Sequence, residues 1–199
     1  MLLKIIGLFF WPKRTWQGIA ELSPTQLRFY MFYPVVLSLL PAVAWYFGTS
    51  QTGWTIGDSD PIRLTEDSAM VIAICFYITQ ILAIWVIGYF IHWMSTTYGA
   101  ESTATKGMVL IGFTATPILL AGLIGFYPNF SIDLLVAIAA VSYSVYLLYI
   151  GIPIAMNVPV ERGFFYASAV VGVALVIVIT VMGGSLILWI LGLEPVFTD

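Results

Sequence analysis

Three tyrosines and one glutamine are the polar side chains whose types and spacing could form a binding site within apolar segments of this sequence. Tyr143, Tyr146 and Tyr149 precede Pro153 at intervals of three and four residues, so on a helix the four share an arc of about 120°. Gln80 lies in a separate apolar segment, and its amide needs hydrogen-bond partners when buried. This polar face either joins helices or lines a ligand cavity, and we favour contact between helices.

Nucleophilic and metal chemistry lack the residues they need. Cys75 is the only cysteine and His92 the only histidine, so neither a thiolate metal cluster nor a histidine-paired nucleophile can be assembled. No aspartate or glutamate shares the apolar segment of His92. We therefore expect no catalytic residue, no metal and no cofactor, and we predict that the protein is not an enzyme.

The segment from Gly48 to Thr55 nearly matches a phosphate-binding loop, but Trp54 stands where the motif requires lysine. That lysine contacts the phosphates, and the motif should follow a strand and open a helix. Here it follows an apolar run of membrane length. We interpret it as a glycine-rich turn and expect neither a nucleotide nor a nucleic acid as partner.

Composition excludes a water-soluble domain. Of 199 residues, 61% are hydrophobic and only 9% are charged, whereas soluble domains have about a quarter charged residues. A hydrocarbon core about 30 Å thick needs roughly 20 apolar residues of helix. Five stretches meet this length and contain no Asp, Glu, Lys or Arg: Phe29–Phe47, Ala69–Met94, Gly107–Tyr127, Leu134–Met156 and Phe164–Leu193.

These stretches predict an all-α, polytopic membrane bundle of five transmembrane helices with an N-terminal interfacial amphipathic helix. The strands of a membrane barrel alternate in polarity, and that alternation is absent. Pro34, Pro41, Pro117 and Pro153 lie inside the predicted helices, where proline removes a backbone donor and produces a kink. Since lipid cannot satisfy the freed carbonyls, we expect neighbouring helices, or hydroxyls such as those of Ser38, Thr114 and Thr116, to do so.

The N-terminal segment, residues 1–28, does not resemble a cleaved secretory signal, because positive charge follows its short apolar run and no small-x-small cleavage pattern appears. It fits a helix lying in the membrane interface, with apolar side chains in the headgroup region and Lys4, Lys13 and Arg14 facing anionic lipid. Trp11 and Trp16 would anchor it in the interface.

Charge predicts the orientation of the bundle. With five spans, six of the seven basic residues fall on one side and Arg63 alone on the other. Basic loops stay in the cytoplasm, so we expect a cytoplasmic N-terminus and an extracytoplasmic C-terminus. Seven acidic residues are expected on the outer side: Asp58, Asp60, Glu66, Asp67, Asp133, Glu194 and Asp199.

Four segments resemble the Yip domain family along nearly the whole chain: Trp11–Trp16, Phe47–Asp58, Phe113–Pro117 and Tyr146–Pro153. The resemblance implies five membrane helices, a cytoplasmic N-terminus and, from its bacterial members, a location in the bacterial inner membrane. Eukaryotic members are associated with Rab-type GTPases, but their N-terminal cytoplasmic region is longer than the one here, which does not favour GTPase binding. The resemblance implies no catalytic site.

The sequence therefore predicts three parts: a cytoplasmic interfacial segment 1–28, a five-helix Yip-type domain 29–193 and an extracytoplasmic tail 194–199. The leading hypothesis is a non-enzymatic adaptor or membrane-organising protein that acts through lateral helix contacts. Its partners would be membrane lipids, further copies of the chain or other membrane proteins. The alternative is a transporter or channel for a lipid or a small uncharged solute, with Tyr143, Tyr146, Tyr149 and Gln80 lining a continuous cavity.

Overall fold

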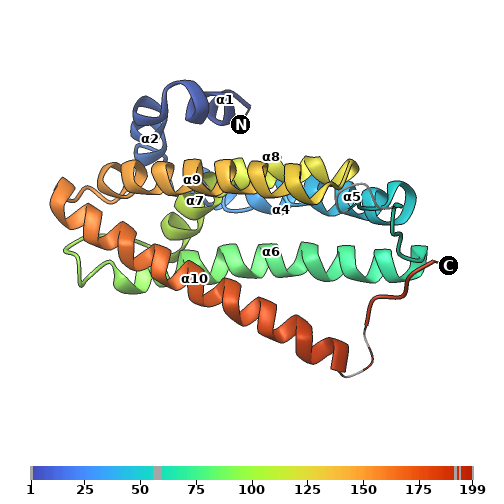
Figure 1. The fold of residues 1–199 in the computed structure, drawn as a ribbon. Helices are drawn as coiled ribbons and strands as arrows, with labels where there is room; N and C mark the ends of the chain where they lie inside the picture. The colour runs from blue at the N-terminus through green and yellow to red at the C-terminus, as the bar shows by residue number, and fades with distance from the viewer. Residues whose placement is uncertain (1, 56–59, 191, 193, 199) are drawn as a thin grey trace.

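The computed structural model describes residues 2–55, 60–190, 192 and 194–198, and within these it is helical, with isolated β-bridges in place of strands. The predicted acidic positions Asp58 and Asp199 lie outside the described residues. The all-α class is confirmed. The long helices lie side by side in a bundle, and α10 runs diagonally away from it (Figure 1).

Three long helices form most of the bundle. A side chain caps the start of two of them: the hydroxyl of Thr65 accepts a bond from the Ser68 N–H, and the side-chain oxygen of Asn129 accepts one from the Ile132 N–H. Such caps satisfy backbone donors that the helix itself leaves free. The helices are α6 (Glu66–Met94), α9 (Phe130–Ala155) and α10 (Val160–Ile190).

The first span is a series of short helices, together covering residues 24–52. It begins with a capping box in which the Ser23 hydroxyl and the Gln26 side chain each accept a backbone N–H from the other residue. The span then continues through several short elements. They are α3 (Pro24–Tyr30), α4 (Tyr33–Leu37), α5 (Leu39–Phe47) and the π-helix η1 (Gly48–Thr52).

The predicted third span is bent. Ala104–Thr114 and Thr116–Phe126 meet at an angle of 43°. The four remaining apolar helical stretches are long enough to cross a membrane, and the bent pair brings the count to five only if it forms one span. Its elements are α7 (Ala104–Thr114), α8 (Thr116–Ala121) and the 3-10 helix η2 (Gly122–Phe126).

The connecting segments gather at two ends of the bundle. At the end that we call distal, Thr55 pairs with Asn129 and Leu64 pairs with Phe197, so two loops and the C-terminal segment lie together. At the opposite, proximal end, α6 and α9 terminate and α10 begins. There Tyr166 donates its hydroxyl to the Ile91 carbonyl and stacks on Tyr98.

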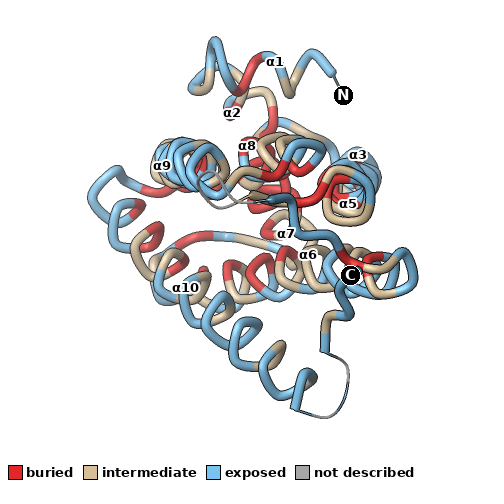
Figure 2. Tube along the Cα trace, turned by 45° about the vertical axis from the view of Figure 1, so that its right-hand side comes forward, coloured by how far each residue is buried: buried red, intermediate tan, exposed pale blue. Residues whose placement is uncertain are grey.

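The hydrophobic core lies towards the proximal end. It combines fully buried side chains of α7, α9 and α10, such as those of Leu110, Leu147 and Val170. The distal half of α10 is largely exposed, as the pale blue of its lower part shows (Figure 2). The bundle is therefore packed tightly at one end and opens towards the other.

Two N-terminal helices, α1 (Leu2–Phe10) and α2 (Pro12–Ala20), pack on one side of α9. The predicted position of Trp16 as an interface anchor is wrong, because its side chain is fully buried. It contacts Gly151 of α9, where an added methyl group would lie 2.5 Å from the indole. Leu3 and Phe10 remain exposed, as an apolar outer face requires.

Candidate functional site

Tyr143 joins the N-terminal helices to the bundle. Its hydroxyl donates to the carbonyl oxygens of Leu8 at 2.9 Å and Phe9 at 3.2 Å. Its ring stacks on Phe9 with centroids 5.5 Å apart. Carbonyls near the end of a helix have no partner inside that helix, so this phenol satisfies acceptors that hydrocarbon would leave unpaired.

The other two tyrosines of the predicted face have different environments. The hydroxyl groups of Tyr149 and Ser168 lie 2.8 Å apart, which connects α9 to α10. The side chain of Tyr146 is 48% exposed and touches Tyr143 at a centroid distance of 5.5 Å. The three tyrosines therefore share one helix but reach α1, the molecular surface and α10.

Gln80 lies against a different side of α9. Its amide donates to the Phe76 carbonyl one turn earlier in α6, at 3.3 Å. It lines two cavities that also contain Val141 of α9, and neither cavity is lined by Tyr143, Tyr146 or Tyr149. The structure thus does not bring the glutamine and the tyrosines together.

The prolines of the predicted kinks mark contacts between elements. Pro34 faces Gly112, Pro41 faces Gly122 and Pro153 faces Gly163, where a methyl group on each glycine would lie 3.2, 2.4 and 2.6 Å from the proline ring. Pro117 lies in the first turn of α8, directly after the bend of 43°. Glycine therefore provides the space that a rigid proline ring needs in a neighbouring element.

Of the three hydroxyls named for the freed carbonyls, only that of Thr116 forms hydrogen bonds within the described structure. Thr116 donates to the Gly112 carbonyl at 3.5 Å and also lies 2.9 Å from the Tyr33 hydroxyl. The hydroxyls of Ser38 and Thr114 do not take this role, because both oxygens are buried without a hydrogen-bond partner among the described residues. The hydroxyl oxygen of Ser144 in α9 is likewise buried without a hydrogen-bond partner among the described residues.

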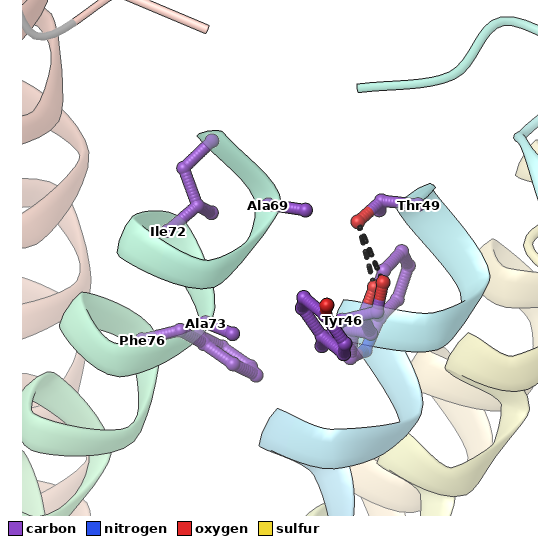
Figure 3. Close-up of a pocket in the computed structure, with 7 residues that line it drawn as sticks. Tyr46, Thr49, Ala69, Ile72, Ala73 and Phe76 are labelled. Carbon is purple, nitrogen blue, oxygen red and sulfur yellow. Dashed lines mark hydrogen bonds between the residues drawn. The ribbon is translucent and has the colours of Figure 1, made fainter. Parts of the chain in front are cut away.

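A series of three cavities follows α6. The distal cavity, of about 310 Å³, lies between α5, η1 and the first turns of α6. Figure 3 shows Ala69, Ala73 and Phe76 of α6 facing Tyr46 and Thr49, whose hydroxyl is bonded to backbone carbonyl oxygen. The middle cavity has about 480 Å³ and the proximal cavity about 370 Å³.

These cavities are neighbours, since they share lining residues. Trp45 and Phe76 line both the distal and the middle cavity. Gln80, Ile118 and Val141 line both the middle and the proximal cavity. Together the three cavities form what we call the path along α6. This path was not predicted from the sequence, because its walls come from ordinary aliphatic residues on several helices that only packing brings together.

Thr114 and Ser144 line the proximal cavity and were not predicted as site residues. The sequence carries a weak signal for each: Thr114 lies in the segment Phe113–Pro117, and Ser144 interrupts an apolar helix. Whether such a hydroxyl bonds back to its own helix or faces a neighbour depends on tertiary contacts. That choice is not encoded in residue spacing.

Titratable groups form no cluster at this path. Within the described part of the chain, no group of three or more His, Cys, Asp and Glu side chains could hold a metal ion. Away from the cavities, Lys4 of α1 donates to the Gly18 carbonyl of α2 at 2.9 Å. Burial lowers the pKa of its ammonium group, while Glu21 acts in the opposite direction. The lining of the three cavities is almost entirely apolar, which suits hydrocarbon.

Comparison with known proteins agrees with the architecture. A model of the Yip1 domain matches residues 6–182. The chain is 31% identical over 183 residues to the inner membrane protein YohC of Escherichia coli K12, covering 92% of this chain and 94% of the relative, and the same values hold for YohC of Escherichia coli O6:H1. No solved structure matches the chain.

Proposed function

Because the chain belongs to the Yip1 domain family and its relatives are inner membrane proteins, we propose that it is a non-enzymatic adaptor or organising component of the bacterial inner membrane. It acts through lateral contacts of its helices with other membrane proteins or with further copies of itself. The observation that carries this proposal is the unpacked distal half of α10.

The proximal half of α10 is held in the bundle by Tyr166, Ala167 and Val170, all fully buried. Beyond it, Ile179 is 69% and Met182 63% exposed, and the helix leaves α6 and α9 (Figure 1). A helix tied to the bundle at one end presents its other half to the bilayer. That half is available to pack on a helix of another molecule.

Small residues on this half suit such packing. A methyl group added at Gly183 or Gly184 would meet no atom within 4 Å, so the backbone is open to close approach by a second helix. In membranes, close approach at small residues supplies the dispersion contacts that drive helix association. The proximal end of α10, which Tyr166 holds in the bundle, would keep this contact surface in a constant orientation.

Photo-crosslinking in native membranes tests this proposal. A photoreactive amino acid at Met182 should yield crosslinks to a partner or to a second copy. The same group at Leu135 of α9, which is 69% exposed against 63% for Met182, should yield mainly lipid adducts. Equal patterns at the two positions, or no protein crosslinks at Met182, would contradict the proposal.

The proposed orientation places the proximal end in the cytoplasm and the distal end in the periplasm. Support comes from the charges, since Lys106 and Arg162 lie at the proximal end, with Arg63, Glu66 and Asp67 at the distal end. Basic residues favour the cytoplasmic side. Alkaline phosphatase fused after Asp199 should be active, and a fluorescent cytoplasmic reporter at that position would contradict the orientation.

The alternative, transport of a lipid or an uncharged solute, draws less support from the tyrosines. Tyr143 and Tyr149 are hydrogen-bonded to neighbouring elements, which fits a role in holding helices together. The cavities along α6 are the feature that favours binding of an apolar molecule, and they raise a separate question about what occupies them.

A further inference from the structure

The two N-terminal helices form a close hairpin. Lys4 of α1 donates from its ammonium group to the Gly18 carbonyl oxygen of α2 at 2.9 Å. Gly7 of α1 lies against Thr15 of α2, so closely that a methyl group added to the glycine would collide with the threonine hydroxyl. The cation of Lys4 is therefore held between the two helices.

A pocket of about 300 Å³ lies between these helices and contains two basic residues. Lys4 and Leu3 line it from α1, and Arg14 and Thr15 line it from α2. None of the residues that line this pocket is acidic. Lys13 is exposed beside Arg14 but does not line the pocket. The structure thus separates three cations that the sequence analysis treated alike.

The positive charge of the pocket is not neutralised by its own lining. Lys4 donates to a carbonyl group, which carries no net charge. Burial lowers the pKa of its ammonium group because the charged form loses water, and a bound anion would offset that loss. Glu21 acts on Lys4 from the end of α2 but does not line the pocket. The pocket can therefore accept an anion from outside the chain.

The hairpin lies at the level of lipid headgroups when α9 crosses the bilayer. α9 has 26 residues, so it is about 39 Å long, against a hydrocarbon core of about 30 Å. Trp16 of α2 contacts Gly151, which lies four residues before the proximal end of α9 at Ala155. That position is about 6 Å from the helix end, close to the boundary between hydrocarbon and headgroups. Gly18, which holds Lys4, is two residues further along α2.

The rim of the pocket is apolar and faces outwards. Leu3 is 85% exposed and Trp11 63% exposed, and both line the pocket. Tryptophan is typical of the membrane interface, where its ring meets both hydrocarbon and headgroups. An anion that carries acyl chains would cover these side chains, whereas a free phosphate ion would leave them exposed. The rim therefore favours a lipid.

We propose that this pocket binds the phosphate group of one anionic phospholipid, with Lys4 and Arg14 as its charged donors and with Leu3 and Trp11 against its acyl chains. Arginine can offer two parallel N–H groups to a phosphate. Lys4 keeps two of its three donors after its bond to Gly18.

This site is separate from the surface that carries the adaptor role. α1 and α2 lie on one side of α9, and the distal half of α10 lies away from them on the other side (Figures 1 and 2). Crosslinks at Met182 test the adaptor role alone, and lipid affinity tests the phosphate site alone.

The experiment measures binding to the full chain in detergent by native mass spectrometry. The probes are dioleoylphosphatidylglycerol, dioleoylphosphatidylethanolamine and inorganic phosphate. The two lipids have the same acyl chains and differ in net charge, so any preference between them reports the headgroup. We expect phosphatidylglycerol to bind more tightly than either of the other probes.

Two neighbouring substitutions distinguish a defined site from general attraction between charges. Arg14→Gln should weaken phosphatidylglycerol binding about tenfold, as expected for one lost charge-assisted hydrogen bond. Lys13→Gln removes the same charge outside the pocket and should leave the affinity almost unchanged. Both side chains are exposed, so both variants should fold. Lys4→Gln should behave like Arg14→Gln, and if it does not fold, the variants at 13 and 14 still decide.

Three results would each overturn the phosphate site. They are equal affinity for the two phospholipids, equal loss of affinity in Arg14→Gln and Lys13→Gln, and displacement of phosphatidylglycerol by an equal concentration of inorganic phosphate. The last result would indicate a site for a free anion.

Discussion

The hydroxyl groups of Tyr33 and Thr116 lie 2.9 Å apart, and both residues are almost completely buried. Tyr33 belongs to α4 of the first span, and Thr116 is the first residue of α8, directly after the bend. The Tyr33 ring also stacks on Phe113, on the other side of the bend, at a centroid distance of 4.9 Å. One tyrosine therefore contacts both halves of the bent helix pair.

We expect Tyr33→Phe to lower the free energy of unfolding by about 0.6 to 2 kcal/mol, the range for one hydrogen bond between membrane helices. The ring and its stacking remain, so the loss reports the hydroxyl. Thermal melting in detergent measures it. Tyr89→Phe is the matched control, since Tyr89 is 54% exposed, and equal melting of the two variants would contradict the prediction.

Gly151→Ala should detach α2 from α9. The new methyl group would lie 2.5 Å from the Trp16 indole, which is fully buried and cannot move aside without opening the contact. We expect faster trypsin cleavage after Lys13 and Arg14. Gly172→Ala, where no atom lies within 4 Å, should cleave at the wild-type rate, and equal rates in both variants would contradict the packing.

A double-mutant cycle on Tyr149→Phe and Ser168→Ala should give a coupling free energy of about 0.6 kcal/mol, because the two hydroxyls bond directly across α9 and α10. Melting of the single and double variants in detergent measures it. Tyr146→Phe should change the melting temperature little, since that side chain is half exposed. Additive effects of the pair would argue against the bond.

Gly107→Ala should destabilise the protein by about 1 to 3 kcal/mol, the usual cost of overpacking. The added methyl group would lie 2.2 Å from the Gly88 carbonyl oxygen, so α6 and α7 would have to separate. The amount of folded protein and its melting temperature report the cost. Gly183→Ala has open space around it and should be tolerated, and similar stability of both variants would refute the close crossing.

The apolar runs predicted the helices well because membrane helices satisfy their own backbone groups, so a long apolar run is sufficient to specify one. Their ends were predicted less well. α6 begins at Glu66, three residues before the expected Ala69, because the Thr65 cap and two acidic residues suit a helix start. The third span was expected as one helix kinked at Pro117, and the structure has a bend of 43° directly before that proline.

The polar face illustrates what spacing cannot predict. The interval of three residues places Tyr143, Tyr146 and Tyr149 along one helix, but their partners come from α1 and α10. Gln80 was grouped with them because a buried amide needs partners, and packing instead placed it at a cavity without tyrosines. The rotation of each helix about its axis decides such contacts.

The sequence by itself predicted an all-helical membrane protein with six of its seven basic residues on one side of the spans, because hydrophobic length and charge are local properties of the chain. Its resemblance to the Yip1 family came from four particular segments. Only the tertiary structure decided that Trp16 is buried against Gly151, that prolines face glycines of other elements, and that Thr114 and Ser144 meet at one cavity. Those relations depend on which helix faces approach each other. In lipid, where apolar faces are nearly equivalent, shape and a few hydrogen bonds make that choice.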